Sequence, residues 1–175
     1  MAAATLLSAA AFASGRYAQA FPSFGSERTG APVVSYCRLS DAPIRLREPV
    51  MHPDAIIVQD STLLLQVDVF AGLTPDGTVL VNSRLTRAAL HLERLAPDRV
   101  MILPATQLAL THAGRPLPNA ALLGGFAAQT GLLSLDSVTR AIRDRFRGGV
   151  ADGNVAAATD AYHRVLSRAK EQVDA

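Results

Sequence analysis

The chain has 175 residues, of which 49% are hydrophobic and 18% are charged, and its formal net charge is +2. This length and composition suit one domain with a hydrophobic core, and the small net charge gives no reason to expect a nucleic-acid partner. No apolar stretch approaches the roughly 20 residues of a membrane helix, and the single cysteine, Cys37, excludes an internal disulfide or a four-cysteine iron–sulfur cluster.

The first predicted element is a helix over residues 1–13, with Gly15 as its stop signal. This alanine-rich start lacks the basic region that precedes the apolar stretch of a secretory signal. We therefore expect a cytoplasmic protein with no membrane partner.

Two short strands and a loop come next. Residues 16–20 and 33–39 are predicted strands, and the latter alternates in part between β-branched or aromatic residues and others. The loop at 21–30, FPSFGSERTG, concentrates glycines, serines and phenylalanines around Glu27 and Arg28. Loops at the strand ends of α/β sheets commonly bind ligands, although a plain solvated connection explains the same charged residues.

Buried strands then alternate with helical segments. The apolar run AIIVQ at 55–59 is typical of a buried parallel strand, and residues 78–82 and 100–104 repeat the pattern. The predicted helices are residues 61–70, 88–95, 119–130, 134–146 and 154–168. This alternation predicts a three-layer α/β/α domain with a largely parallel, Rossmann-like sheet.

The beginning of the chain departs from this plan. Open α/β domains usually start with a strand and a glycine-rich turn, whereas Met1 stands directly at the head of the first predicted helix. We therefore expect a single domain over residues 1–175 that lacks the usual first strand.

The residue types that commonly carry catalysis form no recognisable centre. The histidines are widely separated, and none is followed four residues later by a second histidine or a carboxylate: His52, His91, His112 and His163. Cys37 lies inside a predicted strand, which favours a packed thiol over a nucleophile. The motifs of serine hydrolases, zinc proteases and P-loop proteins are absent. We expect neither a catalytic residue nor a metal ligand.

Polar residues at the ends of predicted elements have a structural interpretation. Asn82 and Ser83 end a strand and Asn119 begins a helix, so all three can be plain N-caps. Asp54 and Asp60 flank the first buried strand and can cap adjacent structure. Nothing marks these two carboxylates as an acid–base pair.

From FPSFGSERTGAPVVSYCRLSDAPIRLR onward, the sequence resembles the γ subunit of 2-oxoacid:ferredoxin oxidoreductases, the pyruvate and 2-ketoisovalerate oxidoreductase family. The resemblance continues through HPDAIIVQDSTLL, GLTPDGTVLVNS, ILPAT, NAALLGGFAAQTGLLSLDSVTRAIRDRF and NVAAATDAY. These strings are weak one by one, but together they cover most of the chain in the right order. The family normally begins with a strand and a GxGGQG-like loop, which agrees with the missing first strand.

The resemblance implies a subunit that is not catalytic alone. Its complex would convert a 2-oxoacid, coenzyme A (CoA) and an oxidised acceptor into acyl-CoA, CO2 and reduced acceptor. Thiamine diphosphate, Mg²⁺ and 4Fe–4S clusters would be held by partner chains, and this chain alone would bind no cofactor. The implied partners are α-, β- and δ-type subunits and ferredoxin or a similar electron acceptor.

The same resemblance implies that the FPSFGSERTG loop faces the active-site cavity and helps form its CoA end. Ser26 and Arg28 are then candidates to contact CoA phosphates, with Glu27 beside them, and Asn119 is a further candidate. Guanidinium and hydroxyl donors suit phosphate oxygens, and a helix N-terminus adds a favourable dipole.

Two other interpretations stay open. The small subunit of an indolepyruvate oxidoreductase would take an aryl 2-oxoacid instead. A non-catalytic nucleotide-binding or assembly module would be a stable monomer that binds a nucleotide alone, whereas a subunit would expose a sizeable apolar face to its partners.

Overall fold

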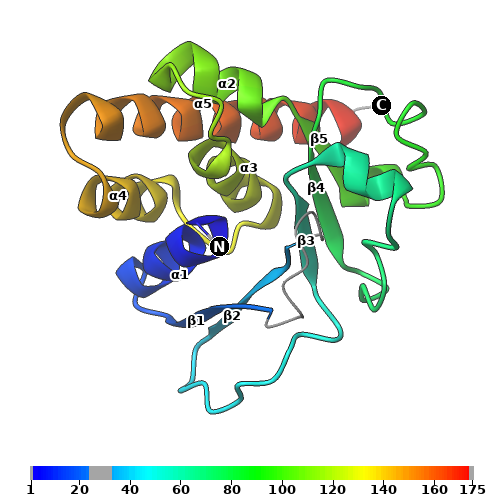
Figure 1. Ribbon diagram of the computed structural model, residues 1–175, viewed down its shortest axis with the longest axis horizontal. Helices are drawn as coiled ribbons and strands as arrows, with labels where there is room; N and C mark the ends of the chain where they lie inside the picture. The colour runs from blue at the N-terminus through cyan, green and yellow to red at the C-terminus, as the bar shows by residue number, and fades with distance from the viewer. Residues whose placement is uncertain (1, 24–32, 174–175) are drawn as a thin grey trace.

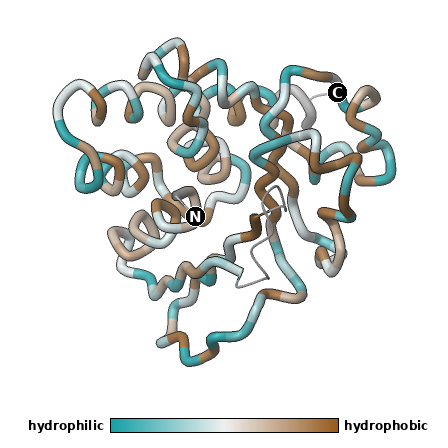
Figure 2. Tube along the Cα trace, in the orientation of Figure 1, coloured by the Kyte–Doolittle hydropathy of each residue, from teal (hydrophilic) through white to brown (hydrophobic). Residues whose placement is uncertain are grey.

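The computed structural model, which describes residues 2–23 and 33–173, is built around a parallel sheet of three strands (Figure 1). The strands lie side by side in chain order: β3 (Ala55–Val58), β4 (Thr78–Asn82) and β5 (Val100–Leu103). Leu80 of the central strand pairs with Ile57 on one side and Met101 on the other. The strands are continuous aliphatic runs because both faces of the sheet are covered, as is usual for parallel sheets; Figure 2 shows them as a band of apolar residues through the middle of the molecule.

The α-helices of the described chain gather largely on one side of this sheet (Figure 1). They are α1 (Ala2–Ala13), α2 (Ala105–Ala113), α3 (Asn119–Thr130), α4 (Leu135–Arg145) and α5 (Gly148–Val173). Among the described residues, no helix combines the length and apolar character needed to cross a membrane. The predicted α/β class and parallel sheet are confirmed.

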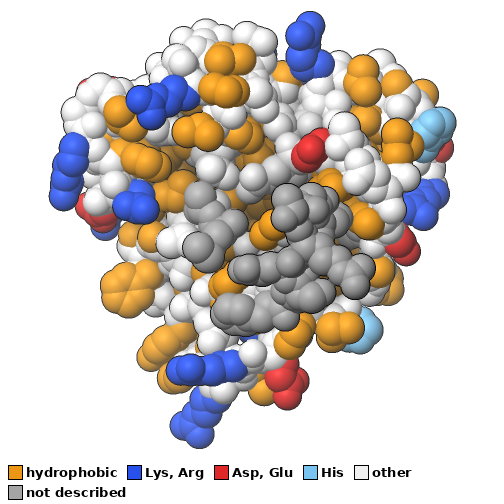
Figure 3. Space-filling model, viewed as in Figure 1, with side chains coloured by type: hydrophobic (Ala, Val, Ile, Leu, Met, Phe, Trp, Pro, Cys, Tyr) orange, Lys and Arg blue, Asp and Glu red, His pale blue; other side chains and the backbone are white. Residues whose placement is uncertain are grey.

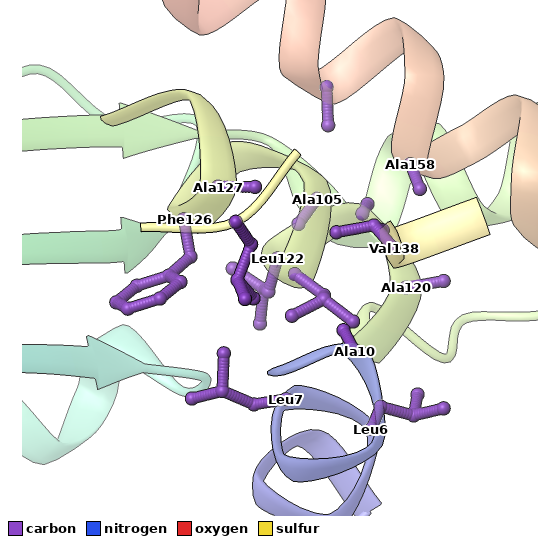
Figure 4. Packing of buried hydrophobic residues seen from close by; sticks show 14 of the residues in the cluster. Leu6, Leu7, Ala10, Ala105, Ala120, Leu122, Phe126, Ala127, Val138 and Ala158 are labelled. Atoms are coloured by element: carbon purple, nitrogen blue, oxygen red, sulfur yellow. The ribbon is translucent and has the colours of Figure 1, made fainter. Parts of the chain in front are cut away.

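The core between the helices combines large aliphatic side chains with many alanines. Leu7 of α1 points toward Leu122 and Phe126 of α3 (Figure 4), and Leu6 belongs to the same buried cluster. Ten of the 23 buried members of this cluster are alanines, which let the helix backbones approach closely. A Cβ added at Gly124 would lie only 2.1 Å from a backbone oxygen of α5. The fold therefore depends on close contact between α3 and α5.

The opposite face of the sheet carries a second apolar cluster, covered by a 3₁₀ turn and loops instead of α-helices. Its buried members are Val58, Val79, Val81, Leu90, Leu92 and Val100. The predicted helix at 61–70 is wrong beyond its first part, because only the 3₁₀ helix η1 (Ser61–Leu65) forms there. Asp68 accepts a hydrogen bond from the Phe70 amide, which offers the backbone a local alternative to a helix.

The predicted helix at 88–95 is also wrong. His91 has a left-handed φ of 53°, which interrupts any helix at its centre. Its neighbours Leu90 and Leu92 are both buried under the sheet. The apolar residues that suggested a helix at 88–95 are therefore buried from a turn instead.

The remaining strands form a separate antiparallel pair, β1 (Tyr17–Pro22) and β2 (Ser35–Ser40). Ala18, Cys37 and Leu39 on one face of this hairpin pack against the core of the helical side. Both strands fall close to their predicted positions. Their antiparallel pairing sets them apart from the parallel sheet.

Candidate functional site

A cavity of about 480 Å³ opens at the carboxyl ends of β3 and β4. It is lined by Gln59, Asp60, Ser61, Asn82, Thr106, Pro116 and Pro118. These residues follow two parallel strands and precede or begin helices α2 and α3. Ligands of open α/β folds bind at this edge of the sheet, so the cavity is the first candidate site.

Asn82 fixes one wall of this cavity. Its Nδ2 donates to the Gln59 carbonyl oxygen at 2.9 Å and to Thr106 Oγ1 at 2.8 Å, and its Oδ1 accepts from the Thr106 amide at 3.1 Å. Helix α2 has Pro104 at its N-cap position, which provides no side-chain cap. Asn82 thus caps a helix that begins far along the chain, which confirms a capping role and links β3, β4 and α2.

Asp60 provides the negative charge of the cavity. Its carboxylate accepts hydrogen bonds from Thr62 Oγ1 at 2.7 Å and from the Thr62 amide at 2.9 Å. The bond from the Thr62 side chain, followed by that from the Thr62 amide, lowers the pKa of Asp60 below its ordinary value. The predicted capping role is confirmed. Asp54 lies at the other end of β3, and the two carboxylates do not form an acid–base pair.

Asn119, the candidate CoA contact outside the FPSFGSERTG loop, is the first residue of α3 and follows directly on Pro118 of the cavity wall. Pro118 occupies the N-cap position, so the interpretation of Asn119 as the N-cap is wrong. Asn119 is half-buried, and its carboxamide makes no hydrogen bond within residues 2–23 and 33–173. Its side chain is therefore available to a ligand.

The other candidate residues, Ser26, Glu27 and Arg28, lie outside the described residues. What the structure describes are the flanks of their loop, where the Ser23 amide donates to the Val34 carbonyl oxygen at 2.9 Å. This bond extends the β1–β2 pairing. The predicted CoA loop therefore connects β1 and β2 at the end of the hairpin where Pro22 pairs with Ser35.

Near this end the hairpin carries a group of side chains that sequence reasoning missed. The Phe21 and Tyr36 ring centroids are 5.4 Å apart, and the Arg38 guanidinium carbon lies 5.5 Å from the Phe21 ring centroid. Gln19 Oε1, Ser35 Oγ and Arg38 Nη1 are buried, and none of them has a hydrogen-bond partner among residues 2–23 and 33–173. The alternation of side chains between the two faces of β1 and β2 is the sequence signal that could have identified this group.

A second cavity, of about 360 Å³, lies between the end of β5 and α5. Its arginines already have partners: Arg164 Nε donates to Asp160 Oδ1 at 2.6 Å, and Arg168 Nη1 donates to the Ile102 carbonyl oxygen at 2.5 Å. His112 Nε2 of α2 lies 2.9 Å from Asp160 Oδ2. These contacts tie α2, α5 and β5 together, which is a structural role.

Cys37 is a packed thiol, as predicted. Burial raises its pKa to about 12, so the reactive thiolate is strongly disfavoured at neutral pH. In the part of the chain that the structure describes, no three His, Cys, Asp or Glu side chains are grouped to hold a metal ion.

Comparisons with known proteins agree on one family. A family model described as pyruvate ferredoxin/flavodoxin oxidoreductase matches residues 1–164. The "pyruvate/ketoisovalerate oxidoreductases common subunit gamma" of Pyrococcus abyssi is 43% identical over 164 residues, which are 93% of this chain and 88% of the relative. "Pyruvate synthase subunit PorC" of Methanosarcina barkeri is 48% identical over 141 residues, or 81% and 76% of the two chains.

A solved structure shows the same fold. The crystal structure of pyruvate oxidoreductase subunit PORC from Thermotoga maritima superimposes with a TM-score of 0.76 at 31% identity. The superposition covers 92% of this chain and 86% of that one.

Proposed function

Because the chain belongs to the pyruvate ferredoxin/flavodoxin oxidoreductase family, as a γ subunit, we propose that it forms part of the CoA end of the active-site cavity in its complex. The complex would convert a 2-oxoacid, CoA and oxidised ferredoxin into acyl-CoA, CO2 and reduced ferredoxin. The relatives' names point to pyruvate and ketoisovalerate as substrates. We accordingly place pyruvate-type 2-oxoacids ahead of aryl 2-oxoacids.

The residues of this chain do not fit an iron–sulfur cluster. Such a cluster needs several cysteine thiolates, whereas this chain has one cysteine, whose pKa is raised to about 12 by burial. We propose that the clusters, thiamine diphosphate and Mg²⁺ are held by α-, β- and δ-type partner subunits. The contribution of this chain would be to bind and orient CoA.

The observation that carries this proposal is the cavity at the carboxyl ends of β3 and β4. Helix α3 begins at its wall, where first-turn amides and the half-buried Asn119 suit a phosphate group. The ionised Asp60 disfavours phosphate but accepts hydrogen bonds from a hydroxyl or an amide N–H. CoA carries both kinds of group, so it can satisfy both parts of the wall.

Arg28 and its neighbours Ser26 and Glu27 supply the second part of the proposal. A guanidinium can bind a CoA phosphate in a bidentate fork. The hairpin end from which this loop leaves also carries Arg38 and an aromatic pair. An arginine and aromatic rings together suit a phosphate beside a stacked base.

The test is Arg28→Ala in the assembled complex. A hydrogen bond to a charged group contributes about 1.5–3 kcal/mol, so the KM for CoA should rise about 10- to 100-fold. Thiamine-dependent decarboxylation in the absence of CoA should be unchanged. Asn119→Ala should raise the same KM by a smaller factor because it removes a neutral group.

The matched control is Arg140→Ala on α4, which removes an exposed arginine that pairs with Asp136 four residues earlier. Its KM for CoA should equal that of the unmodified complex. An unchanged KM for Arg28→Ala would remove Arg28 from the CoA site. Failure of that variant to assemble would assign Arg28 a structural role.

A further inference from the structure

Residues 41–54, between β2 and β3, form an exposed segment that we call the arm. It contains no helix or strand. Figure 1 shows it projecting below the hairpin, away from the helices. A connection of this length without regular structure is uncommon in a compact domain and usually has a function.

The arm is anchored at its first residue and along its second half. Asp41 pairs with Arg16 at 2.9 Å, and the Pro49 carbonyl oxygen accepts a hydrogen bond from Arg38 at 3.3 Å. A Cβ at Gly72 would lie 2.0 Å from the Met51 carbonyl oxygen, so only glycine permits this approach. These contacts shape the arm before it meets any partner, which reduces the entropy cost of binding.

The outer part of the arm has no such partners within this chain. Residues 43–48 make no hydrogen bond or ion pair in the described structure, and this includes the side chains of Arg45 and Arg47. Leu46 is 60% exposed and Met51 is 68% exposed. Figure 3 shows basic and apolar side chains together at this lower end of the molecule. Leu46 thus lies between two arginines that are unpaired in the described structure, and Met51 adds a second exposed apolar side chain nearer to β3.

We propose that the arm docks into an apolar groove with an acidic rim on a partner subunit of the same oxidoreductase. Leu46 and Met51 would fill the groove, and Arg45 and Arg47 would pair with carboxylates at its edge. Methionine and arginine are enriched in protein interfaces. The outer part of the arm, residues 43–48, has one acid, Glu48, against these two arginines, so this part favours an acidic partner. Relatives of this chain are named as subunits of an oxidoreductase, so we expect the partner to be another subunit of that complex.

The test is reconstitution of the complex from the full chain and its partner subunits, with Leu46→Glu as the variant. Burial of one leucine side chain is equivalent to roughly a 10- to 100-fold change in dissociation constant, and the affinity should fall by at least that factor. Met51→Glu should have a similar effect. Both residues are exposed, so the isolated variants should keep the melting temperature of the original chain.

The matched control is Leu65→Glu. Leu65 is 77% exposed in η1, beyond the opposite end of β3, and its substitution introduces the same charge. Affinity for the partners should change less than about threefold, well below the 10-fold effect of burying a leucine. The proposal is overturned if Leu46→Glu assembles as tightly as the original chain, or if Leu65→Glu weakens assembly equally.

Charge reversal tests the acidic rim. Arg45→Glu with Arg47→Glu should slow association with the partner and make its rate less sensitive to salt. An increase in the association rate would contradict an acidic rim. The isolated chain is also examined by sedimentation: a dimer that Leu46→Glu dissociates would overturn the proposal and assign the arm to a second copy of this chain.

Discussion

The contact between α3 and α5 predicts that Gly124→Ala destabilises the chain, although alanine is the better helix former. A Cβ at Gly124 would lie 2.1 Å from the Ala158 carbonyl oxygen and 2.7 Å from its carbonyl carbon. Ordinary van der Waals contact begins at 3.4 Å, so the two helices must separate by about 1.3 Å (3.4 − 2.1). The obstacle is backbone within α5, which cannot rotate away.

The expected magnitude follows from two opposing effects. Overpacking of a core costs about 1–3 kcal/mol and occasionally more. Replacement of glycine by alanine in a helix returns up to about 1 kcal/mol. We expect a net loss of about 2 kcal/mol in the free energy of unfolding because the clash is with backbone. For a chain of this length, this corresponds to a fall in melting temperature of about 4–8 °C.

The assay is urea and thermal unfolding of the purified chain, followed by far-UV circular dichroism, with Gly125→Ala as the matched control. The nearest atom to a Cβ at Gly125 is the Leu103 Cδ2 methyl, at 2.8 Å. A leucine methyl can move, so this substitution should change stability by less than about 1 kcal/mol. Equal stability of the two variants would refute the argument that the α5 backbone sets the helix spacing.

Two further substitutions test contacts between elements. Asn82→Ala should lower the free energy of unfolding by about 1–3 kcal/mol, because it leaves the Thr106 amide and the Gln59 carbonyl without their partner; urea unfolding that shows no loss would contradict the capping role. Asp160→Asn should lower the melting temperature at neutral pH. Arg164, followed by His112, holds the pKa of Asp160 below its ordinary 3.8, so the stability it contributes is present above that value and is lost as the pH falls through the lowered pKa. The difference between variant and original should therefore shrink below about pH 4, and a constant difference across that range would count against this ion pair.

The sequence predicted elements well where local signals and burial agreed. Helix α3 has the predicted bounds, because prolines precede it and Gly131 ends it in a left-handed conformation. Helix α2 was missed. Its N-cap position is a proline without a capping side chain, and its cap comes from Asn82, 24 residues earlier in the chain. A cap supplied by tertiary structure leaves no local pattern in the sequence.

The candidate site shows the same limit. Asn119 was identified as a candidate from the family resemblance and its place at the head of a helix, and it directly follows Pro118 of the cavity wall. The sequence could not show that Asn82 is already engaged while the Asn119 carboxamide makes no hydrogen bond in the described structure. Both are asparagines beside helix starts, and only the three-dimensional positions of Pro104, Thr106 and Pro118 distinguish them. Which polar group is available to a ligand is thus a property of the fold.

The two proposed roles of the chain, partner docking by the arm and CoA binding at the cavity, belong to opposite ends of strand β3. The arm enters at its amino end and the cavity opens at its carboxyl end. At roughly 3.3 Å per residue, its four residues place these features about 13 Å apart along the strand. Substitutions at Leu46 should therefore change assembly without changing the KM for CoA of the complexes that do form. Substitutions at Asn119 should do the reverse, because Asn119 directly follows Pro118 of the cavity wall, whereas no residue of the arm lines the cavity.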